Sequence, residues 1–157
     1  EEITRDIESI FIGNIENEVQ NANRKPIWKD VIEEFHLTHG FNKKFSQIEY
    51  IELMSRAKYG LTLKGYGLKC HREIECFALG VIPLVSDGIP MHAYLNPPIE
   101  GVHYFRVSTP DDVRNVIRDT SDERRVEMSR NCKRWYLENV HSDNWWFSML
   151  KKMVYLH

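Results

Sequence analysis

The chain is poor in the features that mark disulfide-rich and membrane-spanning proteins. Its 157 residues include three cysteines, an odd number without regular spacing, which argues against a disulfide framework. No run of about eighteen apolar residues is present, so the sequence predicts no membrane span. It also has no recognisable signal peptide, no internal repeat and no low-complexity segment.

Two nucleotide-binding fingerprints are missing as well. The sequence contains neither Gly-x-Gly-x-x-Gly nor a Walker loop ending in Gly-Lys-Ser/Thr, which disfavours dinucleotide-binding and P-loop enzymes. The formal net charge of −2 gives no support to general binding of nucleic acid or anionic membranes.

Metal-binding and thiol chemistry also find little support. His36 and His39 lie three apart and Cys70 adjoins His71, but these spacings form no pair of zinc-ligand knuckles. The sequence does not show a histidine and an asparagine in the order that would mark Cys70 as a catalytic nucleophile. We therefore expect no metal site and no resident cofactor.

What the chain does contain is an alternation of short apolar runs with amphipathic stretches. This alternation predicts one α/β domain, a Rossmann-like parallel sheet with helices on both faces. The expected strands are 7–13, 59–63, 81–85 and 102–107, with a further short strand before the loop 39–45 as an option. The expected helices are 26–37, 46–57, about 69–79, 110–118, 121–139 and 143–156.

Smaller signals refine several of these elements. Ser46 and Glu49 form a capping-box pattern at a helix start, and the apolar residues Ile48, Ile51, Leu53 and Met54 are the expected buried stripe of that helix. Gly80 suits the position just after a helix end, where a left-handed backbone is favoured.

The stretch from Lys64 to Asp87 organises the rest of the prediction. It contains a strand end, a loop with Gly65 and Gly67, a helix, a tight turn and a second strand. Glycines let the backbone approach a ligand, and the helix N-terminus behind them favours phosphate. Ligands of parallel sheets bind outside the carboxyl ends of the strands, where the loops after Gly13, Leu63 and Val85 should all open.

The same stretch resembles the donor-binding half of GT-B glycosyltransferases, most closely their exostosin-like branch. That branch combines a glycine-rich loop, an arginine, and a glutamate three residues later that opens Glu-Ala-Leu-x-x-Gly-x-Ile-Pro-Val. Arg72, Glu75 and the turn Gly80-Val81-Ile82-Pro83 reproduce this spacing. Cys76 and Phe77 replace the usual Ala-Leu, and the resemblance covers residues 59–90.

The resemblance implies a donor-binding role for a set of residues. Glu75 would accept hydrogen bonds from both ribose hydroxyls, and Arg72 would contact the diphosphate through its forked donors. The loop 41–46 would hold a base, uracil or guanine. The other implied donor-site residues are Gly13, Gly65 and Gly67 for close approach, Lys64 and His71 near the diphosphate, and Asp87 at a sugar hydroxyl.

The resemblance also bears on the reaction. Retaining relatives carry a second glutamate eight positions before the first, and Gly67 stands there. An inverting, metal-independent transfer from a nucleotide sugar to a glycan or other hydroxyl acceptor is therefore favoured. The catalytic base would come from an N-terminal GT-B half, which we expect precedes Glu1 in a longer protein. We expect a cytoplasmic location, or the Golgi lumen if the full-length protein is a membrane-anchored eukaryotic transferase.

Simpler interpretations stay open for the same residues. Glu73 and Glu75 can be solvated helix carboxylates, Arg72 a surface or ion-pairing arginine, and the glycines turn residues only. The helices expected over 121–157 either pack on this domain or cross to a further half of the protein. Their aromatic group, Trp145, Trp146 and Phe147, would accordingly serve core packing or an interdomain contact. The alternative to a transferase is a non-catalytic α/β interaction module or a degenerate transferase half.

Overall fold

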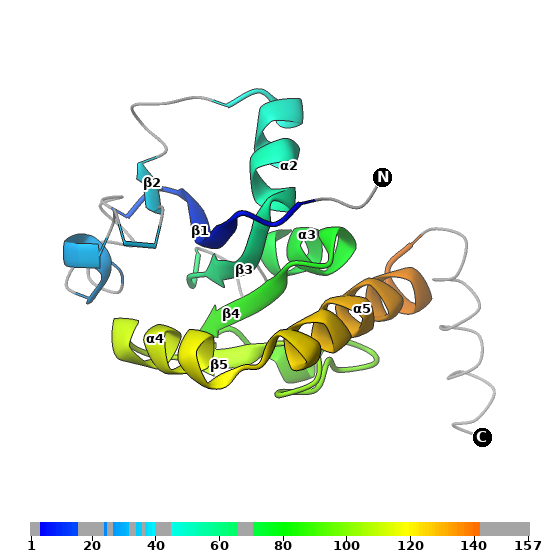
Figure 1. The fold of residues 1–157 in the computed structure, drawn as a ribbon. Coiled ribbons are helices and arrows are strands. Elements are labelled where there is room, and N and C mark those ends of the chain that lie inside the picture. The colour runs from blue at the N-terminus through cyan, green and yellow to red at the C-terminus, as the bar shows by residue number, and fades with distance from the viewer. Residues whose placement is uncertain are drawn as a thin grey trace, which may run out of the picture.

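The structure is a computed structural model that describes residues 4–15, 24, 27–31, 34–35, 37–39, 45–65 and 71–141. The strands are β1 (Ile7–Gly13), β2 (Leu37–His39), β3 (Ala57–Thr62), β4 (Ile82–Ser86) and β5 (Phe105–Val107). The α-helices are α2 (Gln47–Ser55), α3 (His71–Leu79), α4 (Pro110–Asp119) and α5 (Asp122–Asn139), and the short 3-10 helices are η1 (Lys29–Val31) and η2 (Met91–Ala93) (Figure 1).

The five described strands form one sheet in the order β2-β1-β3-β4-β5, and every neighbouring pair is parallel. The Rossmann-like α/β prediction is confirmed. From β1 the chain moves outward to β2 and then returns to β3 on the other side of β1. The strand order therefore reverses between β1 and β3, and the crevice at such a switch point is where doubly wound sheets bind ligands.

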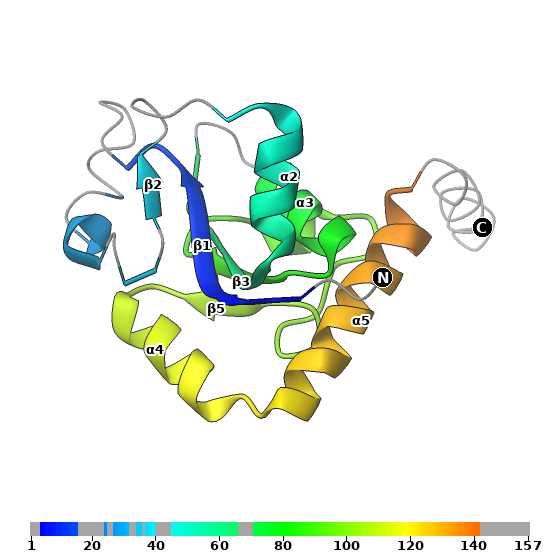
Figure 2. The ribbon, with the colours of Figure 1, turned by 45° about the horizontal axis from the view of Figure 1, so that its top comes forward.

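Helical segments cover both faces of the sheet. Successive side chains of a strand point to opposite faces, and β1 follows this rule. Ile12 packs in one cluster with Met54 of α2 and Cys76 of α3, whereas Phe11 packs in the other cluster with Trp28. Figure 2 shows α2 and α3 together on one side of β1, with α4 beyond β5.

Helix α5 extends the layer formed by α3. The rings of Phe77 and Trp135 lie with centroids 4.8 Å apart, and Cys132 and Trp135 are buried in the cluster that contains Phe77. At the end of α3, Gly80 has a φ of 67°, so the predicted left-handed position is confirmed.

Gly60 in β3 permits a close contact between the sheet and α3. A Cβ atom at this position would lie 2.5 Å from the Cys76 sulfur and 3.2 Å from Cγ1 of Val81. Real Cβ atoms essentially never come as close to another atom as the contact with the Cys76 sulfur would require, so a side chain here would push α3 away from the sheet.

The predicted apolar stripe of α2 is wrong in part. Its capping box forms as expected, with both Ser46 and Glu49 engaged. Met54 is buried, but Ile48 and Ile51 are 68% and 42% exposed. The helix buries the face that carries Tyr50 and Met54, and these residues are four apart. Ile48 and Ile51 lie on the other face.

Two further expectations need correction. The strand expected over 102–107 is confined to β5, because residues 101–103 form a turn in which Gly101 has a φ of 75°. The helix expected over 26–37 is interrupted, since η1 ends at Val31 and β2 begins at Leu37. The expected start of α3 before His71 and the helix of 143–156 lie outside the described residues.

Candidate functional site

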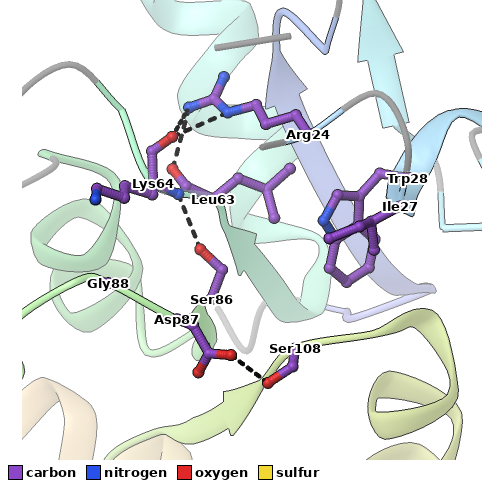
Figure 3. A pocket seen from close by; sticks show the side chains of 9 residues that line it. All are labelled: Arg24, Ile27, Trp28, Leu63, Lys64, Ser86, Asp87, Gly88 and Ser108. Carbon is purple, nitrogen blue, oxygen red and sulfur yellow. Dashed lines mark hydrogen bonds between the residues drawn. The ribbon is translucent and has the colours of Figure 1, made fainter. Parts of the chain in front are cut away.

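A pocket of about 350 Å³ opens at the carboxyl ends of β3 and β4 (Figure 3). This is the sheet edge where the sequence placed the ligand. The loops after β1, β3 and β4 all leave the sheet at this edge because the strands are parallel, so the predicted common edge of the three loops is confirmed. The pocket is lined by Arg24, Ile27, Trp28, Leu63, Lys64, Ser86, Asp87, Gly88 and Ser108.

The walls of the pocket differ in chemistry. Trp28 and Ile27 form an apolar side that faces the end of β4 (Figure 3). The opposite side is polar, because Ser86 accepts a hydrogen bond of 2.9 Å from the amide of Lys64 and Asp87 accepts one from the Ser108 hydroxyl. An apolar wall facing a few placed polar groups suits a small, partly polar ligand.

Arg24 ties two strand ends together beside this pocket. The side chain is only 5% exposed. Its guanidinium donates to the carbonyls of Asn14, Leu63 and Lys64 at 2.7 to 3.1 Å, so it spans the ends of β1 and β3. Sequence reasoning missed this residue, because Arg24 stands in a polar segment whose pattern carries no signal.

Arg72 reaches the same switch point from the first turn of α3. Its Nη2 donates to the carbonyl of Ile12 at 2.6 Å, and its guanidinium lies 4.5 Å from the centroid of the Phe11 ring. Nε is buried and has no hydrogen-bond partner among the described residues. Arg72 therefore lies across the end of β1, and its Nε–H group has no acceptor among the described residues.

Gly13 makes room for this arginine. A Cβ atom on Gly13 would lie 2.7 Å from the Phe11 ring and 3.0 Å from Nη2 of Arg72. The absence of a side chain thus lets the guanidinium approach the end of the strand.

Two permanent positive charges consequently flank one buried ring at the switch point. The guanidinium of Arg24 lies 5.5 Å from the Phe11 centroid, and that of Arg72 lies 4.5 Å from it. Arginine stays protonated at any physiological pH and presents planar forked donors. The arrangement can therefore attract and orient an anion such as a phosphate group.

Glu75 lies one helical turn beyond Arg72 and is half-buried. Its Oε2 accepts a hydrogen bond from the hydroxyl of Tyr50 in α2. Burial, together with this bond to the carboxylate, raises the pKa of Tyr50 above its ordinary value, so the phenol keeps its proton and donates.

Glu73 has a different environment. It is fully buried, and its Oε1 accepts a hydrogen bond of 2.9 Å from Tyr94. The interpretation of Glu73 as a solvated helix carboxylate is therefore wrong.

The predicted donor-site residues do not all meet at one place. Lys64 and Asp87 line the pocket, whereas Gly13 and Arg72 meet at the end of β1, outside the pocket lining. Glu75 and the exposed His71 belong to α3, and Gly65 follows Lys64 after β3. Gly67 and most of the loop 41–46 lie outside the described residues, as does Cys70. The donor-binding roles stay predictions.

The described residues offer neither a metal-binding cluster nor a membrane-spanning helix. Over the part of the chain that the structure covers, no group of three or more His, Cys, Asp or Glu side chains is placed to hold a metal ion. None of the described helices is long and apolar enough to cross a membrane.

The sequence was also compared with known proteins. No protein-family model matches the chain, and no curated protein is significantly similar to it.

Proposed function

We propose that this chain is the donor-binding part of a glycosyltransferase that uses a nucleoside-diphosphate sugar. The sequence resemblance to the exostosin-like branch of GT-B enzymes suggested this function, and the position of Arg72 is the observation that supports it best. Its guanidinium lies at the β1/β3 switch point and retains a buried Nε donor. A diphosphate is the ligand that forked, unused guanidinium donors bind well.

The neighbouring features fit the same ligand. Arg24 adds a second positive charge at the switch point, and α3 carries Glu75 one turn beyond Arg72. The nearby pocket offers Asp87 and Ser108 to hydroxyl groups and Trp28 as an apolar wall. In this proposal the diphosphate binds at Arg72, the ribose at Glu75, and the sugar extends toward the pocket.

Fixed positive charge at Arg72 would also assist the reaction. Negative charge develops on the leaving nucleoside diphosphate during glycosyl transfer, and oriented donors stabilise it. The acceptor and the general base that deprotonates its hydroxyl belong, in this proposal, to an N-terminal half. The transfer would be inverting and metal-independent, and the base uracil or guanine.

Ligand-induced stabilisation tests the proposal directly. Thermal melts with millimolar UDP or GDP should show a raised Tm for one of the two, since a ligand at about 100 times its Kd stabilises by about 2.7 kcal/mol. Arg72→Gln should abolish the shift. The exposed Arg118, which pairs with Asp119, supplies the matched control Arg118→Gln, which should keep it.

The absence of a shift with every nucleoside diphosphate would contradict the proposal. Transfer itself is tested on the full-length protein by following release of the nucleoside diphosphate from donor sugars. Binding without release would instead indicate a degenerate transferase half.

A further inference from the structure

The indole N–H of Trp28 is a hydrogen-bond donor that meets no acceptor at the pocket. Trp28 is only 2% exposed, yet it lines the pocket, and its Nε1 donates to none of the described residues. Nor is this nitrogen among the fully enclosed polar atoms that lack a partner in the described part of the chain. In Figure 3 it lies on the side of the ring that faces Leu63 and the pocket. The N–H group is therefore available to a ligand.

Trp135 shows the arrangement that a buried indole normally has. Its Nε1 donates to the carbonyl of Asn96 at 3.0 Å, as expected because a buried tryptophan N–H usually finds a partner. A buried donor without an acceptor costs stability. Trp28 departs from this pattern at the position where the pocket opens, and a ligand with an acceptor group would remove the cost.

The polar side of the pocket keeps hydrogen-bonding capacity as well. Ser86 accepts from the amide of Lys64, and its own hydroxyl hydrogen is left to donate, because a hydroxyl is one donor and two acceptors. Asp87 accepts from Ser108, and the other lone pairs of its carboxylate are open to further donors. The pocket therefore offers two donors, from Trp28 and Ser86, and a carboxylate acceptor.

These groups favour a ring that carries several hydroxyls. A hydroxyl both accepts and donates, so one such ring can accept from Trp28 and Ser86 and donate to Asp87. A phosphate in the pocket would be repelled by the Asp87 carboxylate. A stacked nucleobase needs the open face of an aromatic side chain, and Trp28 exposes too little surface for that. The volume of about 350 Å³ is at the lower end of the range for small-molecule pockets.

The pocket adjoins the proposed diphosphate site. Arg24 lines the pocket, and its guanidinium lies over the same Phe11 ring as that of Arg72. A ligand that fills both places must carry its hydroxylated ring directly beside its diphosphate, as a nucleoside-diphosphate sugar does.

We infer that the pocket is the subsite for the transferred sugar and that Trp28 is a specificity-determining residue, whose indole N–H donates to a sugar hydroxyl. Ser86 and Asp87 bind further hydroxyls of the same ring. The inference rests on the proposed function and extends it, because it assigns recognition of the sugar to a residue outside the stretch that carries the family resemblance.

NMR spectroscopy tests the contact directly, because each tryptophan of the isotope-labelled chain gives its own indole N–H peak. Trp28→Phe, or sequential assignment of the wild type, identifies the Trp28 peak. We expect this peak to move when UDP-glucose, UDP-galactose or GDP-mannose binds, and to stay in place when the nucleoside diphosphate alone binds. The Trp135 peak is the internal control. Its N–H already donates to Asn96, so it should stay in place with either kind of ligand.

Isothermal titration measures what the contact contributes to affinity. Trp28→Phe keeps an aromatic ring and removes the N–H, so it should weaken binding of the nucleotide sugar about fivefold and change that of the nucleoside diphosphate less than about twofold. Trp135→Phe is the matched control, since it removes an N–H that faces Asn96, and it should change neither affinity. If Trp28→Phe folds poorly, Asp87→Asn at an exposed position provides the second variant. Its amide can still accept from Ser108, and it should weaken the nucleotide sugar about fivefold as well.

Two outcomes would overturn the inference and leave the proposed function intact. One is a wild type that binds a nucleoside diphosphate but whose Trp28 peak stays in place with every nucleotide sugar of that base. The other is a folded Trp28→Phe, or in its place a folded Asp87→Asn, that binds the nucleotide sugar as tightly as the wild type. A wild type that binds no nucleoside diphosphate would instead overturn the proposed function, and this inference with it.

Discussion

Arg24 is a buried cation whose described hydrogen bonds all go to main-chain carbonyls at the ends of two strands. It joins Asn14 after β1 to Leu63 and Lys64 after β3. Removing it would leave these acceptors without their donor in a largely buried place, and an unsatisfied buried group costs about 1–3 kcal/mol. Arg24 therefore links the segments that follow β1 and β3 through the hydrogen bonds of a single side chain.

We expect Arg24→Met to lower the free energy of unfolding by about 3 kcal/mol, measured by urea denaturation. Arg118→Met is the control, because Arg118 forms its ion pair at the exposed surface and such pairs contribute about 0–1 kcal/mol. Equal effects of the two substitutions would show that the Arg24 contacts do not stabilise the fold.

Gly60 offers a second test at the residue scale. Gly60→Ala places a methyl group against the Cys76 sulfur, and overpacking of this kind costs about 1–3 kcal/mol. The loss should appear in urea denaturation. Adding Cys76→Ala in the same chain should recover part of it by making room. A double variant less stable than the sum of the two single variants would contradict this explanation.

At the scale of elements, α4 is fixed by its first turn. Thr109 accepts from the amide of Asp112, and the Asp112 carboxylate accepts from the amides of Ser108 and Thr109 at 2.8 Å. These backbone hydrogen bonds lower the pKa of the Asp112 carboxyl below its ordinary value. The carboxylate is therefore stabilised in its charged form when the protein is folded.

This lowered pKa gives the stability a defined pH dependence. A carboxyl group whose folded pKa is depressed stabilises the fold above the unfolded pKa, and the stabilisation is lost as the pH falls through the folded pKa. The difference in free energy of unfolding between wild type and Asp112→Asn should therefore shrink from pH 6 toward pH 3. Denaturation at several pH values checks this, and a constant difference would contradict it.

At the scale of the whole molecule, the order of strands in the sheet determines which strands are the last to lose their hydrogen bonds by local unfolding. β3 has hydrogen-bonded neighbours on both sides, whereas β5 has one described neighbour, β4. Tyr59 and Leu61 of β3 are buried. Amides of central strands usually exchange only through near-global unfolding.

We therefore expect the amides of β3 to exchange with deuterium more slowly than those of β5. Native-state hydrogen exchange followed by NMR measures both strands in one sample. Exchange in β5 as slow as that in β3 would show that the edge strand does not open independently.

The local pattern of the sequence predicted much of this architecture. Alternation of apolar strands with amphipathic stretches identified β1 with its observed bounds, α4 and α5 within one residue at each end, and the parallel sheet. The capping box at Ser46 and the glycine at position 80 were also predicted. These features depend on residues within a few positions of one another, so a linear pattern carries them.

Tertiary structure alone decided which side chains meet. The pairing of Tyr50 with Glu75 joins residues 25 apart, and the contacts of Arg24 reach 40 positions along the chain. The exposure of Ile48 likewise depends on which face of α2 the sheet covers. No spacing rule encodes such contacts, because they arise only when the fold packs segments that are distant in the sequence against one another.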